Sequence, residues 1–147
     1  MSVRELLKRK PGGVVSIDSG ERTAAATHAL VAHAVGGLPV VAPDGSLVGF
    51  VSERDVVRAV EKHRRDVGEL PVTEIMTRPA PTCSAGDAIG DVMARMTRDR
   101  LRHLVVVDQG RLFGVISVGD LVKHRLDELQ TEAGVLRDYV AGQRAIP

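Results

Sequence analysis

Two segments of the sequence place a glycine, a serine and an aspartate at the same spacing. They are Gly49-Phe-Val-Ser52-Glu-Arg-Asp55 and Gly114-Val-Ile-Ser117-Val-Gly-Asp120. In each, an apolar run typical of a strand ends at the serine, and a predicted helix follows. A helix N-terminus attracts phosphate because its first backbone N–H groups are unpaired. The hydroxyl can bond a phosphate or sugar oxygen, the carboxylate can accept both hydrogens of a ribose cis-diol, and the glycine would let a ligand approach closely. The two segments therefore fit a nucleoside phosphate.

The same spacing has a structural interpretation that needs no ligand. Ser-x-x-Asp before a helix is typical of a capping box, in which the hydroxyl accepts an N–H of the first turn and the acid accepts the serine N–H. Most helices need such a residue, so we expect capping at both corners. Two copies at matching places in a repeated unit favour ligand binding in addition.

The two segments lie within a longer internal repeat, which is the most informative feature of the sequence. Residues 45–57 align with residues 110–122 and share Gly45/Gly110, Leu47/Leu112, Gly49/Gly114, Ser52/Ser117, Asp55/Asp120 and Val57/Val122. Upstream, residues 38–41 align with residues 104–107 after a one-residue insertion in the turn, where insertions are best tolerated. Each copy predicts the element order β-α-β-β-α.

Hydrophobic periodicity and turn residues give the extent of each predicted element. The first copy has strands at 14–17, 38–42 and 47–51 and helices at 21–35 and 53–62. The second copy has strands at 80–83, 103–107 and 112–116 and helices at 87–99 and from 118 onward. The expected fold class is α/β, with an N-terminal segment at 1–12, a first unit at 13–68, a second unit at 69–127 and a C-terminal helical extension at 128–147.

The last predicted helix has a regular apolar seam. Its members, spaced alternately by four and three residues, are Val122, Leu126, Leu129, Ala133, Leu136 and Val140. This period of 3.5 residues is typical of helix-on-helix packing. We expect the seam to contact a second subunit and so to form a homodimer. Packing of the helix along its own domain is the alternative.

Composition argues against several classes of function. Lys and Arg number 20 and Asp and Glu 19, and this near-neutral balance is unlike a protein that coats nucleic acid or an acidic membrane. Aromatic residues make up 2%, too few for a platform that stacks single-stranded nucleic acid. No apolar run reaches the roughly 20 residues that span a bilayer, and the first ten residues have no signal-peptide core. We therefore expect a cytoplasmic protein that binds neither membrane nor nucleic acid directly.

Residue types needed for catalysis or metal binding do not converge in the sequence. Cys83 is the single cysteine, so we expect a buried thiol and neither a disulfide nor a thiolate metal cage. His28 and His33 are five residues apart, which does not suit chelation from one helical face. No phosphate loop, dinucleotide glycine fingerprint or nucleophile elbow occurs. We expect no catalytic residues, no metal, no required cofactor and no enzymatic activity.

With these elements in place, the sequence resembles a tandem pair of cystathionine-β-synthase-type (CBS) domains over about residues 13–127. Apart from the two motifs, the resemblance rests on Leu38-Pro-Val-Val41, Val72-Thr-Glu-Ile-Met-Thr77 and Arg102-His-Leu-Val-Val-Val-Asp108. It implies two units packed through their sheets, with two clefts for AMP, ADP, ATP, S-adenosylmethionine or NADH. It also implies a regulatory module without catalytic activity, often a homodimer, that changes the behaviour of an attached or docked protein.

The resemblance implies a role for each candidate nucleotide-binding residue. Asp55 and Asp120 would hold ribose hydroxyls, Ser52 and Ser117 would bond ribose or phosphate oxygens, Ser16 and Thr82 would contact the base, and Arg102 and His103 would neutralise phosphate. In the first unit, Gly36 and Gly37 stand in place of this basic pair, and Arg54 could supply a charge instead. We therefore expect one cleft to bind a ligand better than the other.

An interaction or scaffold protein with the same fold and vacant clefts is the alternative function. Val105 stands where the family usually has a proline, which the first unit retains as Pro39, and the first unit lacks the basic pair. Adenosine-containing ligands would then fail to stabilise the protein, which distinguishes the two functions.

Overall fold

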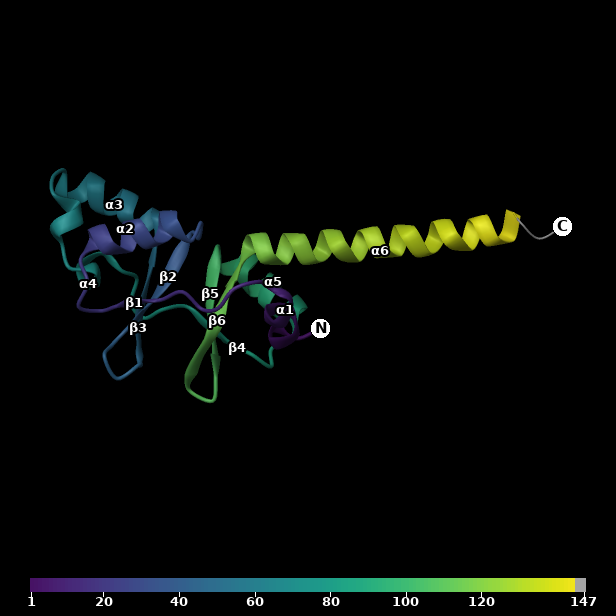
Figure 1. The fold of residues 1–147 in the computed structure, drawn as a ribbon, viewed down its shortest axis with the longest axis horizontal. Coiled ribbons are helices and arrows are strands. Elements are labelled where there is room, and N and C mark those ends of the chain that lie inside the picture. Colours follow the sequence, from purple (N-terminus) through teal and green to yellow (C-terminus); the bar gives the residue numbers. More distant parts are fainter. Residues whose placement is uncertain (145–147) are drawn as a thin grey trace.

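The computed structural model describes residues 1–144 and consists of two three-stranded sheets, the helices packed on them and one long C-terminal helix (Figure 1). The first sheet contains β1 (Ile17–Asp18), β2 (Gly37–Val41) and β3 (Leu47–Ser52), in that order. The second contains β4 (Thr82–Ser84), β5 (His103–Asp108) and β6 (Arg111–Ser117), in that order. In both sheets the first strand runs parallel to the second, and the second runs antiparallel to the third. The two sheets thus repeat one topology.

The helices complete the predicted β-α-β-β-α order in each repeat, so the α/β fold class is confirmed. The helices of the first repeat are α2 (Thr23–Ala32) and α3 (Glu53–His63), and those of the second are α5 (Ile89–Asp99) and α6 (Val118–Arg144). A short helix precedes each repeat, α1 (Val3–Arg9) or α4 (Val72–Ile75), and a 3-10 turn, η1 (Val67–Glu69), follows α3. Residues 145–147 of the predicted helical extension lie outside the described residues.

Helix α2 is shorter at both ends than the periodicity predicts. At its start Arg22 is extended, with φ −88° and ψ 162°, where its backbone pairs with Pro71. The Thr23 hydroxyl then donates to the Leu70 carbonyl oxygen at 2.9 Å. At its end Ala34 adopts a left-handed φ of 52°, which turns the chain toward β2. Pairing with a distant segment therefore sets the start of the helix, and periodicity alone does not reveal it.

Each short helix packs on the sheet of the repeat that it does not precede. Helix α1 precedes the first repeat, yet Val3 is fully buried in the core of the second and its N–H donates to the Asp87 carbonyl at 2.9 Å. Helix α4 precedes the second repeat, yet Val72 is fully buried in the core of the first and its N–H donates to the Glu21 carbonyl at 2.9 Å. The connections after both short helices therefore cross from one unit to the other.

A glycine in the third strand of each sheet lets a neighbouring segment come close, which is the chain after α4 at Gly49 and a side chain of α1 itself at Gly114. A Cβ on Gly49 would lie 2.6 Å from Met76 Sδ and 2.8 Å from the Thr77 carbonyl oxygen. A Cβ on Gly114 would lie 2.9 Å from Leu7 Cδ1. The atoms nearest to a Cβ at either glycine belong to the protein itself, so close packing already requires glycine there, and a close approach by a ligand stays a prediction.

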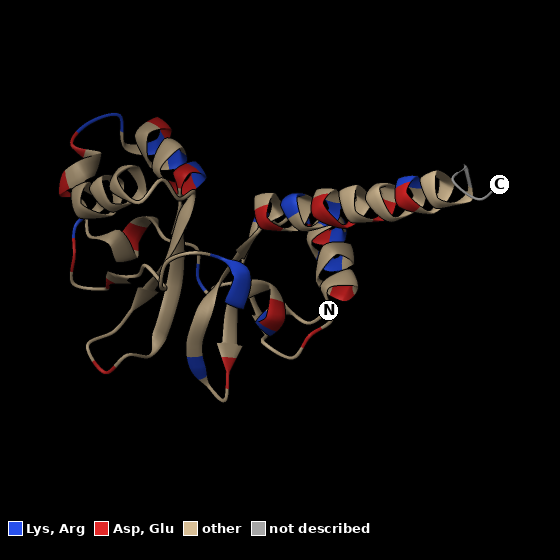
Figure 2. Ribbon diagram, turned by 45° about the vertical axis from the view of Figure 1, so that its right-hand side comes forward, with Lys and Arg blue, Asp and Glu red and all other residues tan. Residues whose placement is uncertain are grey.

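Helix α6 extends well beyond the rest of the protein as one helix of 27 residues (Figure 1). Its early turns are packed, and Leu121 and His124 are buried. The seam beyond them is open, with side chains exposed by 53% at Leu126, 44% at Leu129 and 63% at Leu136. Figure 2 shows acidic and basic residues interspersed along the helix. The seam therefore does not pack along its own domain. None of the described helices is long and apolar enough to cross a membrane.

We predict that Gly49→Ala lowers the free energy of unfolding by about 1–3 kcal/mol, the usual cost of overpacking. The Thr77 carbonyl oxygen cannot retreat easily, because it accepts the Phe50 N–H at 2.9 Å. Gly114→Ala should cost less, because the atom it meets is the end of a flexible leucine side chain. Urea denaturation of the two variants measures both effects.

Gly90→Ala in α5 is the matched control for these variants. A Cβ at this position has no atom within 4 Å, and alanine is the better helix former by roughly 1 kcal/mol. Gly90→Ala should therefore leave stability unchanged or raise it. If Gly49→Ala and Gly90→Ala lowered the free energy of unfolding equally, the close approach of Met76 and Thr77 would not be the reason that residue 49 must be glycine.

Candidate functional site

The serine and aspartate of both motifs form capping boxes at the strand-to-helix corners. At the first corner, Ser52 N–H donates to Asp55 Oδ2 at 2.9 Å and Asp55 N–H donates to Ser52 Oγ at 3.2 Å. At the second, Ser117 N–H donates to Asp120 Oδ2 at 2.9 Å and Asp120 N–H donates to Ser117 Oγ at 3.1 Å. The capping interpretation is confirmed at both helices. Because an ionised carboxylate has about four acceptor positions, capping leaves capacity for a ligand.

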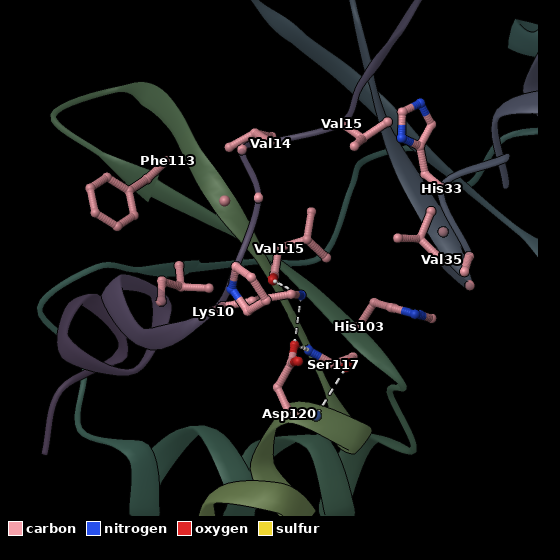
Figure 3. Close-up of a pocket in the computed structure, with 18 of the residues that line it drawn as sticks. Lys10, Val14, Val15, His33, Val35, His103, Phe113, Val115, Ser117 and Asp120 are labelled. Carbon is pink, nitrogen blue, oxygen red and sulfur yellow. Dashed lines mark hydrogen bonds and ion pairs between the residues drawn. The ribbon is translucent and has the colours of Figure 1, made fainter.

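The second corner opens into a cleft of about 720 Å³ (Figure 3). Ser117 and Asp120 line it where β6 ends and α6 begins. The segment between α1 and β1, residues 10–15, and the segment between α2 and β2, residues 33–37, line it as well. Chain segments from both repeats thus enclose the cleft. Its volume falls in the range of small-molecule sites, roughly 300–1,000 Å³.

Lys10 reaches into this cleft and contacts the aspartate of the second motif. Its Nζ lies 2.9 Å from Asp120 Oδ2 and 3.2 Å from the Val115 carbonyl oxygen (Figure 3). The ion pair is partly open to solvent, with side chains 39% exposed at Lys10 and 23% at Asp120. Among the described residues no hydrogen bond is made to Asp120 Oδ1, so that oxygen can still accept.

His103 lines the same cleft at the start of β5 and packs against the first repeat. Its Nε2 would lie 3.1 Å from a Cβ on Gly36, and its ring centroid lies 5.4 Å from that of Phe50. Burial lowers the pKa of His103, and the positive charge of Lys10 lowers it further, although Asp120 acts in the opposite direction. The imidazole is therefore mainly neutral near pH 7. The role of His103 toward a phosphate stays a prediction.

The first corner is closed by the chain that follows α4. Asp55 is buried, with 6% of its surface exposed, and the Thr77 hydroxyl donates to its Oδ1 at 3.1 Å. Thr77 is held there by two backbone hydrogen bonds with Phe50, of 2.8 and 2.9 Å. Both oxygens of Asp55 are thus engaged by the protein, and neither Ser52 nor Asp55 lines the cleft described above.

The other residues predicted from the sequence lie outside the lining of this cleft. Ser16, Arg54 and Arg102 are exposed, and Thr82 is half-buried in β4 beside Val105. The structure therefore brings together His103, Ser117 and Asp120 and does not bring the remaining candidates to the same place. Their roles toward a ligand stay predictions.

The described residues contain no group of three side chains that could hold a metal ion. Cys83 is buried as expected, and burial raises the pKa of its thiol to about 11.

Sequence reasoning missed Lys10, although the sequence contains a signal for the short helix that precedes it. Val3-Arg-Glu-Leu-Leu-Lys-Arg9 matches Val72-Thr-Glu-Ile-Met-Thr-Arg78 in its valine, glutamate and arginine and in the two apolar residues between them. This second, shorter repeat marks the two short helices as equivalent. The segment at the end of each helix reaches a motif aspartate, Asp120 from Lys10 and Asp55 from Thr77, but the two residues are not aligned, because Thr77 matches Lys8 and Lys10 matches Pro79.

Two solved structures show the same fold with substantial sequence identity. A CBS-domain-containing protein from Agrobacterium tumefaciens is 35% identical, with a TM-score of 0.80 over 84% of this chain and 92% of that one. A CBS domain protein from Pyrobaculum aerophilum, complexed with AMP, is 32% identical, with a TM-score of 0.76 over 89% of this chain and 99% of that one.

A relative of known activity matches over only a part of its own length. Inosine-5'-monophosphate dehydrogenase of Mycobacterium tuberculosis is 34% identical over 134 residues, which is 87% of this chain and 24% of the enzyme. The chain spans 24% to 41% of the length of this relative and one other curated protein.

The family model described as "CBS domain" matches residues 3–62 and again residues 72–127. Both matches begin at a short helix and together they cover most of the sequence. With the repeated sheet topology and the strand-to-helix corners, they show that this chain belongs to the CBS domain family, as a tandem pair.

Proposed function

We propose that the protein is a regulatory sensor of adenosine-containing nucleotides, that it has no catalytic activity of its own, and that its ligand binds in the cleft beside Ser117 and Asp120. The chain belongs to a family of regulatory modules that bind adenosyl ligands, and a member 32% identical to it is complexed with AMP. The observation that carries the proposal is the placement of Asp120 at the strand-to-helix corner of an open cleft.

The lining of the cleft has the groups that a nucleoside requires. Asp120 Oδ1 is available for a ribose hydroxyl, and Ser117 lies beside it at the same corner. Val15, Val35 and Phe113 supply apolar surface for a base. His103 offers a mainly neutral imidazole as a further hydrogen-bonding group. Most small-molecule sites combine apolar walls with a few placed polar groups in this way.

The two corners differ in how readily they can accept a ligand. Asp120 is partly exposed in an open cleft, whereas Asp55 is buried and already accepts the Thr77 hydroxyl. Binding at the first corner would require Thr77 to leave Asp55. We therefore propose the second corner as the stronger site. The other predicted residues remain candidates to contact a nucleotide, either at a weaker first site or at the second site after a rearrangement. They are Ser16, Ser52, Arg54, Thr82 and Arg102.

We also propose that the protein is a homodimer through parallel pairing of α6. The exposed seam supplies the apolar contact, and Glu132 and Arg137 flank it. In a parallel pair, Glu132 of each helix lies beside Arg137 of the partner subunit, which is the usual charge pairing across such a seam. A fully overlapped antiparallel pair would instead place the two Glu132 carboxylates together and Lys123 near Arg137 of the partner subunit. The charges thus favour the parallel arrangement.

A scaffold with vacant clefts is the second candidate function, and one observation favours it. Both motif aspartates already have a partner within the chain, Thr77 for Asp55 and Lys10 for Asp120. A protein that binds no ligand would keep these contacts permanently. Ligand binding decides between this function and the sensor.

The sensor function predicts that AMP, ATP, NADH or S-adenosylmethionine binds the protein and raises its melting temperature. Asp120→Asn should weaken that binding at least tenfold, because hydrogen bonds to a charged group contribute about 1.5–3 kcal/mol. Asp55→Asn alters the equivalent capping box in the other unit, and it should change affinity at the second corner by less than about threefold on the same scale. Titration calorimetry of the three proteins measures both effects. Equal weakening by the two variants would contradict the assignment to the second corner, and no shift with any ligand at millimolar concentration would favour the scaffold.

The parallel dimer predicts that Leu136→Cys forms a disulfide between two subunits under mild oxidation. In a parallel pair the two copies of residue 136 face each other, whereas an antiparallel pair places residue 136 beside residue 126. Thr131→Cys, on the opposite face of α6, is the control and should not crosslink. Cys83 is buried and should not interfere. Non-reducing electrophoresis reads the result, and a monomer by light scattering at micromolar concentration would count against the dimer.

A further inference from the structure

The ammonium of Lys10 contacts one of the two carboxylate oxygens that a ribose diol of the proposed nucleotide would use. Its Nζ lies 2.9 Å from Asp120 Oδ2, on the cleft side of the corner (Figure 3). Asp120 also accepts the Ser117 N–H, which fixes the carboxylate at the helix start. A ribose diol that takes both carboxylate oxygens must therefore displace Lys10 and cannot be accommodated by a movement of the aspartate.

Displacement of Lys10 is energetically accessible. The pair is partly exposed, and exposed ion pairs contribute little to stability because water and salt screen them. The lysine ammonium is a point charge on a flexible four-carbon stem, so it can move without a change in the backbone. The contact with the Val115 carbonyl is 3.2 Å long and is not charge-paired.

A displaced Lys10 needs a new anionic partner, and the nature of the ligand decides whether it finds one. Two lysines, Lys8 and Lys10, line the cleft. No arginine of the described residues does, and Arg54 and Arg102 both lie outside the lining. Asp120 is the acidic residue among the lining residues. Once a ribose occupies Asp120, a neutral nucleoside leaves the ammonium unpaired. A nucleotide brings its own phosphate into the same cleft.

We propose that Lys10 is a specificity-determining residue, which selects phosphorylated adenosine compounds over unphosphorylated ones by moving its ammonium from Asp120 to the phosphate of the ligand. This inference rests on the proposed nucleotide-binding function of the cleft. The exchange conserves the number of ion pairs when a nucleotide binds and loses one when a nucleoside binds. The connection between α1 and β1, which lies outside both sequence motifs, thus discriminates between phosphorylated and unphosphorylated adenosine compounds.

The test is titration calorimetry of adenosine and AMP with the protein of residues 1–147 and its Lys10→Met variant. Methionine keeps the length and apolar stem of lysine and removes the charge. The wild type should prefer AMP over adenosine. Lys10→Met should reduce that preference by about tenfold or more, the usual size of one charge-assisted hydrogen bond, with adenosine binding unchanged or tighter.

Arg9→Met is the matched control, because it removes a positive charge from the same segment, and Arg9 is exposed, lies outside the cleft lining and makes no ion pair among the described residues. It should change the preference by less than about threefold, since a general electrostatic effect is screened by salt. An equal change in the Arg9 and Lys10 variants, or an unchanged preference in Lys10→Met, would overturn the inference while AMP binding still supports the sensor function. If neither compound binds the wild type or Lys10→Met, the inference fails, and the sensor function then depends on the titrations with ATP, NADH and S-adenosylmethionine.

Discussion

Neither three-stranded sheet of this protein is covered by the helices of its own repeat alone. The second core includes Val3 of α1, and the first core includes Val72 of α4, and both valines are fully buried. Burying a valine side chain stabilises a fold by roughly 1.5–3 kcal/mol, so these contacts hold the short helices in place. Glycines in the third strands make room for these contacts, Gly49 for the connection that leaves α4 and Gly114 for the Leu7 side chain of α1.

This crossing explains the differences between the two corners. Both connections run past a motif aspartate, but they bring different side chains to it. At Asp55 the connection pairs with β3 and presents the hydroxyl of Thr77, which is compatible with a buried carboxylate. At Asp120 it presents the ammonium of Lys10 across an open cleft. One repeated architecture thus yields one closed corner and one corner that a ligand can reach.

Much of the fold could be predicted from the sequence, because local patterns encode it. The alternation of strands and helices follows from periodicity, and the capping boxes follow from Ser-x-x-Asp before each helix. The partners of the short helices could not be predicted in the same way, because a helix of four or seven residues has no periodicity that identifies its sheet. The lowered pKa of His103 depends on burial against the first repeat, which its neighbours in sequence do not show. Aligning residues 3–9 with residues 72–78 identifies the short helix before Lys10 but not Lys10 itself, whose counterpart is Pro79.

The exchange of short helices has a mechanical consequence. Helix α1 is anchored in the second core, and α6 begins at the end of that same sheet. The first unit is therefore topologically an insertion between two segments of the second. Tension applied between α1 and α6 would load the second sheet directly and would leave the first unit unstrained. A partner attached to either helix would be coupled to the unit that contains Asp120, and the unit that contains Asp55 would not transmit the force.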